Sequence, residues 1–107
     1  IGDVKGKTCI IVDDIIDSGG TIVNAVDALK KNGANEVFVF ITHAVLSGDA
    51  VNKIKKSKIK KLIITDTIDN SKKIKNNNKI EVLSISSLMA EAIKRISNST
   101  SVSDLFN

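Results

Sequence analysis

The hydrophobic positions fall into short apolar runs, and between these runs apolar residues recur at helical spacing. The runs are rich in Ile and Val and are continuously apolar, which is typical of strands buried on both faces. A recurrence every three or four positions, as in 22–31 and 86–96, is typical of an amphipathic helix. The predicted strands are 8–12, 36–42, 61–65 and 80–84, and the predicted helices are 22–31, 49–54 and 86–96.

The alternation of strands and helices predicts an α/β fold with a parallel sheet and right-handed crossovers. Gly33 follows Lys30 and Lys31 and is expected to end the first helix, and Ser47 is a candidate N-cap of the second. We expect the apolar side of the last helix to join the core, together with the inert Cys9. That side carries Leu88, Met89, Ala92, Ile93 and Ile96.

Composition narrows the class of protein. The chain has 107 residues, 42% of them hydrophobic and 26% charged, which predicts one soluble globular domain. Its one Cys and one His exclude a disulfide framework, a thiolate zinc site and a multi-histidine metal site. Neither a membrane span nor a signal peptide is indicated, and we expect a cytoplasmic protein. Because the first residue is Ile1, we expect the chain to be part of a longer one.

The net charge of +4 does not indicate nucleic-acid binding. Among 16 basic residues Arg95 is the single arginine, and the aromatic residues are three Phe. Proteins that grip nucleic acid usually cluster Arg and Lys on one face, and those that hold single strands add stacking aromatics. We therefore interpret the lysines as solvated surface.

The candidate chemistry lies in residues 10–22, IIVDDIIDSGGTI, at the carboxyl end of the first strand. Glycine N–H groups, two hydroxyls and a helix N-terminus together can cradle a phosphate monoester. Two acids before this cradle could accept hydrogen bonds from sugar hydroxyls or hold Mg²⁺. The pattern favours a pentose 5-phosphate over a plain strand-to-helix connection capped by Asp13 and Asp14, and it matches neither a Walker A loop nor G-x-G-x-x-G.

The segment VDDIIDSGGT resembles the signature of the type I phosphoribosyltransferase superfamily. With THAVLSGDA (42–50), TDTI (65–68), LMAEAIKRI (88–96) and SVSDLF (101–106), the chain resembles the C-terminal part of the ribose-phosphate pyrophosphokinase family. Salvage transferases share the segment VDDIIDSGGT. The segments 42–50 and 101–106 favour the pyrophosphokinase family over them. At three positions the chain has an Asp where the family commonly has another residue: Asp49, Asp66 and Asp104.

The resemblance implies a Rossmann-like parallel sheet of the type I phosphoribosyltransferase fold, truncated at its N-terminus. It implies a partial domain over 1–97 and a tail over 98–107 that docks on another domain or subunit. By the same resemblance, Asp13 contacts the ribose hydroxyls, Asp14 lies beside it near the metal, and both are candidate Mg²⁺ ligands. The implied 5-phosphate loop is Asp17, Ser18, Gly19, Gly20 and Thr21, and the implied regulatory phosphate or ADP site between subunits uses Ser101, Ser103 and Phe106.

The implied reaction is Mg²⁺-dependent transfer of diphosphate from ATP to ribose 5-phosphate, which yields phosphoribosyl pyrophosphate (PRPP) and AMP. The residues that hold ATP and the catalytic basic loop are expected upstream of Ile1. The resemblance also implies a homo-oligomer of the hexamer-of-dimers type. The 107-residue chain alone is then expected to be inactive and to self-associate through uncovered apolar surface. His43 is interpreted as a packed or capping residue near the pocket. The alternatives are a purine or pyrimidine phosphoribosyltransferase, a non-catalytic associated subunit, and a PRPP-sensing transcriptional regulator.

Overall fold

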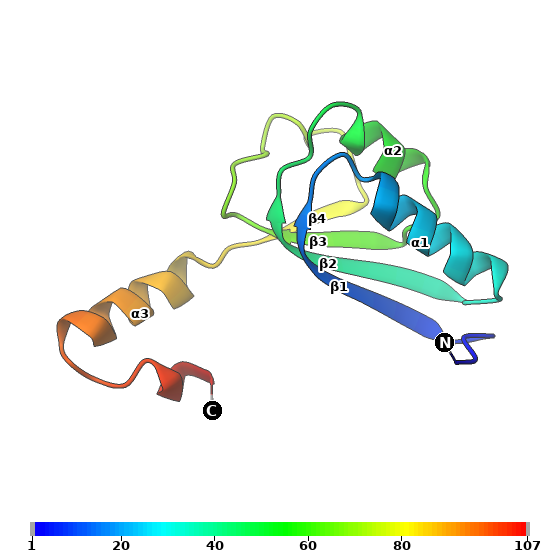
Figure 1. Cartoon of the computed structure of the whole chain (residues 1–107). Coiled ribbons are helices and arrows are strands. Elements are labelled where there is room, and N and C mark those ends of the chain that lie inside the picture. Colours follow the sequence, from blue (N-terminus) through cyan, green and yellow to red (C-terminus); the bar gives the residue numbers. More distant parts are fainter. Residues whose placement is uncertain (1, 107) are drawn as a thin grey trace.

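The computed structural model describes residues 2–106, and within them four parallel strands form one sheet in the order β1-β2-β3-β4 (Figure 1). Helices α1 and α2 lie on one face of this sheet, as successive right-handed crossovers in one direction require. The predicted parallel α/β fold is confirmed. The elements are β1 (Thr8–Ile16), α1 (Gly20–Lys31), β2 (Glu36–Ala44), α2 (Ala50–Lys56), β3 (Lys61–Thr65), β4 (Ile80–Leu83), α3 (Ser86–Ser97) and a 3₁₀ turn (Ser103–Phe106).

β1 and β2 are longer than the apolar runs that predicted them. Pairing continues past Val12, with Asp13 opposite Ile41 and Ile15 opposite His43. The predicted first strand, 8–12, therefore ends too early, because Asp13 and Asp14 both lie within β1. Carboxylates are poor strand formers, but the pairing with β2 resumes beyond them at Ile15 and Ile16.

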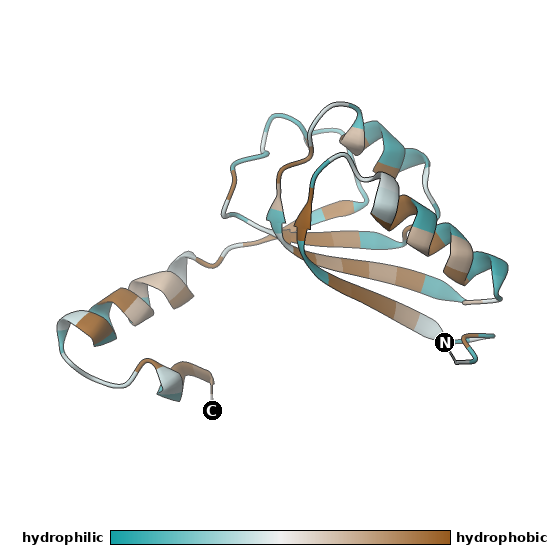
Figure 2. Ribbon diagram, in the orientation of Figure 1, coloured by the Kyte–Doolittle hydropathy of each residue, from teal (hydrophilic) through white to brown (hydrophobic). Residues whose placement is uncertain are grey.

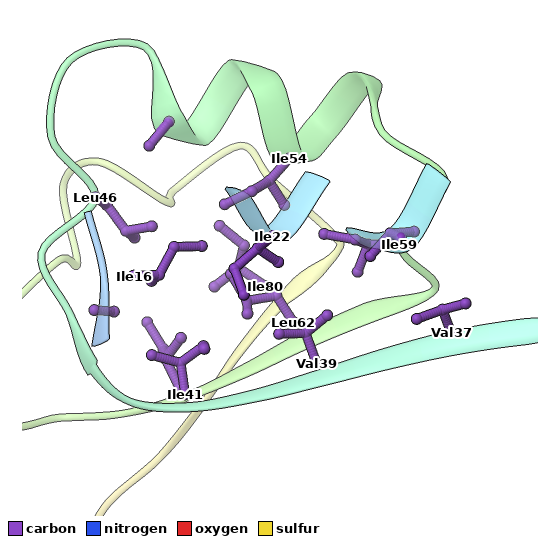
Figure 3. Packing of buried hydrophobic residues seen from close by; sticks show 14 of the residues in the cluster. Ile16, Ile22, Val37, Val39, Ile41, Leu46, Ile54, Ile59, Leu62 and Ile80 are labelled. Carbon is purple, nitrogen blue, oxygen red and sulfur yellow. The ribbon is translucent and has the colours of Figure 1, made fainter. Parts of the chain in front are cut away.

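The core fills the space between the sheet and helices α1 and α2 (Figure 3). Alternate residues of β2 point into it, and Val26 of α1 and Ile54 of α2 meet them from the helix side. Burying each Val, Leu or Ile side chain contributes about 1.5–3 kcal/mol. Cys9 is half-buried and packs against this cluster, in line with its interpretation as a core residue.

Helix α1 ends as its sequence predicts. Gly33 has a φ of 93° and follows the C-cap residue Asn32. The N–H of Gly33 donates to the carbonyl of Lys30, and that of Ala34 donates to the carbonyl of Leu29, each at 3.0 Å. These two bonds form a Schellman motif, whose left-handed residue glycine adopts without a Cβ clash.

The second face of the sheet is uncovered among the described residues. Ile10, Val12, Phe40 and Leu83 are exposed, Val12 to 77%, and Figure 2 shows the apolar colouring of these strands. A parallel sheet normally has both faces buried. The chain by itself therefore presents an apolar sheet surface to solvent.

Helix α3 lies apart from the sheet (Figure 1), and none of its residues is buried within the described chain. The prediction that its apolar side joins the core is wrong: Leu88, Met89, Ile93 and Ile96 are 42–68% exposed. The spacing predicted the helix and its apolar side correctly, but spacing does not say what covers that side. In residues 2–106, no helix has the length and apolar character needed to cross a membrane.

Candidate functional site

A depression of about 260 Å³ lies at the carboxyl end of β1, where the chain turns into α1. Carboxyl ends of strands are where ligands bind in parallel sheets. Most of the residues predicted to bind the sugar phosphate are gathered here, while Asp14 and Gly20 lie outside the lining. The lining residues are Asp13, Ile15, Ile16, Asp17, Ser18, Gly19, Thr21 and Ile22.

The two neighbouring acids of β1 do not converge on one point. Asp13 lines the depression, whereas Asp14 lies outside its lining. The carboxylate of Asp13 accepts the backbone N–H of Asp14 at 2.7 Å. That bond fixes the Asp13 side chain at the mouth of the depression.

The N-terminus of α1 is open toward the ligand side. Gly19 occupies the N-cap position with a φ of 86°, and the first turn has neither a side-chain cap nor an acidic residue among the described residues. The N–H groups of Gly20, Thr21 and Ile22 therefore have no partner within the helix. With the hydroxyls of Ser18 and Thr21 exposed beside them, they form a set of donors suited to an anion.

The loop is tied to the segment that follows β2. The hydroxyl of Ser47 donates to the carboxylate of Asp17, and the Ser47 N–H donates to the Asp17 carbonyl at 3.0 Å. Sequence reasoning missed this role and assigned Ser47 as N-cap of α2. That assignment is wrong, because Asp49 holds the N-cap position. The one available signal was that Ser47 lies in the stretch 42–50 that carries the family resemblance.

His43 lies at the end of β2, beside Ile15 of β1, and outside the lining of the depression. Its Nδ1 is 2.9 Å from the hydroxyl oxygen of Thr67. Thr65 and Thr67 in turn donate their hydroxyls to the carbonyl of Thr42, at 2.5 and 3.2 Å. These contacts give His43 a bridging role between β2 and the loop after β3, which agrees with the capping interpretation.

Hydrogen bonds lower the pKa values of two acids in the loop after β3. The backbone N–H of Ile85 and the hydroxyl of Ser84 lower the pKa of Asp66 below its ordinary value. The backbone N–H and hydroxyl of Ser71 likewise lower the pKa of Asp69. Both carboxylates are therefore structural acceptors that cap turns at this edge of the sheet.

The donor set fits a magnesium ion shared with a ligand better than one held by protein alone. Within residues 2–106, no three His, Cys, Asp or Glu side chains form a cluster that could hold a metal. Mg²⁺ usually keeps several waters and binds through one or two carboxylates plus substrate oxygens. Asp13 offers one such carboxylate at the depression, whereas Asp14 lies outside its lining.

The predicted tail residues lie beyond α3, away from the depression (Figure 1). The hydroxyls of Ser101 and Ser103 are 2.8 Å apart, and Arg95 donates to the Ser101 carbonyl at 3.0 Å. Phe106 is 71% exposed. The structure thus brings the two serines together and leaves the Phe106 ring accessible.

Comparison with known proteins identifies the family of this chain. All of residues 1–107 match the model of a family described as the phosphoribosyl synthetase-associated domain. The chain belongs to that family. It is 51% identical over its whole length to a ribose-phosphate pyrophosphokinase of Vibrio parahaemolyticus and 54% identical to one of Brucella melitensis. In both cases it spans 34% of the relative's length.

A solved structure has the same fold over most of this chain. The phosphoribosylpyrophosphate synthetase of Mycobacterium smegmatis superposes with a TM-score of 0.88 at 40% identity. The match covers 92% of this chain and 33% of the mycobacterial chain. The fold expected from the resemblance is therefore confirmed, and this chain corresponds to about a third of such a protein.

Proposed function

We propose that this chain forms the ribose 5-phosphate site of a ribose-phosphate pyrophosphokinase. The observation that carries the proposal is the pairing of an open helix N-terminus, at Gly19 to Thr21, with the Asp13 carboxylate on the same depression. The first suits a phosphate dianion and the second suits vicinal hydroxyls, so the two ends of one sugar phosphate have matching partners.

Each lining group has a defined part in holding the sugar. The N–H groups of α1 and the hydroxyls of Ser18 and Thr21 donate to the 5-phosphate oxygens. Asp13 accepts from the ribose hydroxyls and offers an oxygen to Mg²⁺, which when bound neutralises charge on the transferred diphosphate. Asp14 and Gly20, which lie outside the lining, contribute through the backbone of β1 and of the first helical turn.

In the proposed reaction the anomeric hydroxyl of the bound sugar attacks the β-phosphorus of ATP, AMP leaves, and PRPP forms. Phosphoryl transfer depends mainly on positioning and on neutralising charge. The residues here position the acceptor sugar, while ATP and the cationic groups bind to other parts of the whole protein. The named relatives favour this activity over the transferase that consumes PRPP.

Several finer assignments belong to the same proposal. Ser101, Ser103 and Phe106 form part of a regulatory phosphate or ADP site at a subunit contact of a cytoplasmic homo-oligomer. The partial domain ends at residue 97, and the tail from 98 docks on another domain or subunit. The exposure of Phe106 and of the apolar side of α3 supports such docking.

A two-ligand titration tests the sugar site. Asp13→Asn should weaken ribose 5-phosphate binding by about tenfold, the effect of one charge-assisted hydrogen bond, and leave methyl phosphate binding unchanged. Asp27→Asn, which makes the same charge change further along α1, should alter neither affinity. The assignment would be contradicted if Asp13→Asn lost equal affinity for ribose 5-phosphate and methyl phosphate. It would also be contradicted if the unmodified protein did not bind ribose 5-phosphate.

A further inference from the structure

Beyond the ligand-binding groups, the segment after β2 determines the shape of the phosphate loop. The N–H groups of Val45 and Leu46 both donate to the carbonyl of Ile16, at 3.0 and 3.3 Å. Ser47 then donates twice to Asp17, from its backbone and from its hydroxyl. The last residue of β1 and the first of the loop are thus held by three consecutive residues.

The holding segment is itself fixed in an unusual conformation. Leu46 has a φ of 52°, a left-handed backbone that residues other than glycine rarely adopt, and its side chain is 1% exposed. Figure 3 shows it beside Ile16 in the core. Strained backbone of this kind persists where the surroundings over-determine it, and it clusters at functional sites.

The loop after β3 completes the support. The amide of the buried Asn70 donates to the Ala44 carbonyl at 2.8 Å. The ammonium of Lys73 lies 3.3 and 3.4 Å from the carbonyls of Val45 and Leu46. Each carbonyl from Ala44 to Leu46 therefore has a partner from this loop, and Ser47 is presented to Asp17 from a fixed position.

The chemistry of Asp17 agrees with a supporting role. A carboxylate repels a phosphate, so it suits the loop only if its charge faces another donor. Ser47 supplies that donor from 30 residues along the chain. One carboxylate oxygen of Asp17 is thereby bonded within the protein although Asp17 lines the depression, whereas the hydroxyls of Ser18 and Thr21 remain for the ligand.

From these contacts we infer that Ser47 is a positioning residue for the phosphate loop and that it acts through Asp17, whose carboxylate serves the loop rather than the ligand. The inference rests on the proposed sugar-phosphate site for its functional consequence. The hydrogen bonds between the two residues exist without a ligand and can be tested separately.

The experiment is a double-mutant cycle in the intact protein, with ribose 5-phosphate affinity measured by calorimetry. Ser47→Ala and Asp17→Ala should each weaken binding about tenfold, and the double variant should be no weaker than either single one. Ser47→Thr keeps the hydroxyl and Asp17→Asn keeps an acceptor, so both should bind within about threefold of the unmodified protein. Ser57→Ala, which removes the hydroxyl bonded to the Ile54 carbonyl at the end of α2, is the matched control and should bind normally.

Two results would overturn the inference. If Asp17→Asn loses as much affinity as Asp17→Ala while Ser47→Ala binds normally, then the Asp17 charge acts on the ligand or its metal. If the effects of the two alanine variants simply add, the residues act independently. Amide exchange at Ser47, measured without ligand, tests the contact separately from the proposed function. Protection that falls in Asp17→Ala, which removes the carboxylate bonded to the Ser47 hydroxyl, but not in Ser57→Ala supports the contact even if the sugar phosphate does not bind. Unchanged protection in Asp17→Ala refutes it.

Discussion

The carboxylate of Asp66 accepts the backbone N–H of Ile85 at 2.9 Å, and it thereby ties the end of β3 to the start of α3. The Ser84 hydroxyl donates to the same carboxylate at 2.7 Å. α3 otherwise lies away from the sheet (Figure 1), so these bonds set the direction in which it leaves. Sequence reasoning noted Asp66 only as a departure from the family pattern.

The Asp66 contact should weaken at low pH. Its pKa is lowered in the folded protein, so its contribution is fully present above its unfolded pKa of about 4 and is lost as the pH falls through the lowered value. The protection of the Ile85 amide against hydrogen exchange should therefore fall in that acid range. In Asp66→Asn this pH response should disappear, whereas Asp69→Asn should affect Ser71 and leave Ile85 unchanged. An equal acid response of Ile85 in Asp66→Asn would show that another group is responsible.

Gly19 and Gly20 should differ sharply on substitution by alanine. Gly19→Ala places a side chain at a φ of 86° and should destabilise the fold by about 1–2 kcal/mol, although the nearest atom to the new Cβ would be an unstrained 3.8 Å away. Gly20→Ala lies in the first turn of α1, where a new Cβ would meet no atom within 4 Å apart from its chain neighbours and nearby helix backbone, and it should be neutral or stabilising by up to about 1 kcal/mol. Urea unfolding measures both. Equal effects would mean that backbone conformation is not what requires glycine at 19.

Two isoleucines test how the apolar side of α3 is placed. Ile54→Ala removes a fully buried side chain of α2 and should cost about 2–5 kcal/mol of unfolding free energy. Ile93→Ala on α3, where the side chain is 62% exposed, should cost less than about 0.5 kcal/mol in the isolated chain. A comparable loss at Ile93 would show that the side is covered.

The isolated chain should self-associate through its uncovered sheet face. Val12→Glu puts a charge in the middle of that apolar surface and should raise the monomer fraction in sedimentation experiments over a range of concentrations. Asn24→Glu makes the same charge change on the exposed side of α1 and should not. Purely monomeric behaviour of the unmodified chain at all concentrations would refute this prediction.

Sequence reasoning recovered the features that local pattern determines. The order of strands and helices, the helix end at Gly33 and the glycine-containing turn that leads into α1 all follow from periodicity and glycine placement. The predicted first strand ended at Val12, too early, because no local signal shows that pairing with β2 continues past two acids.

The missed features depend on contacts between distant residues. Ser47 has the sequence signature of a helix cap, but its hydroxyl goes to Asp17, 30 positions away. The acids Asp13 and Asp14 form one cluster in the sequence, yet only Asp13 lines the depression. The apolar side of α3 was predicted correctly, whereas its exposure could not be derived from spacing.

The central claim is that residues Ser18 to Thr21 bind the phosphate of ribose 5-phosphate while Asp13 binds its sugar. The most direct measurement is a titration of the protein with ribose 5-phosphate and Mg²⁺, following the backbone amide resonances of that loop by NMR. The account predicts saturable shifts concentrated at Ser18–Thr21 that need far more ligand to saturate in Asp13→Ala. Unchanged loop resonances at millimolar ligand, or shifts that Asp13→Ala leaves unaltered, would contradict it.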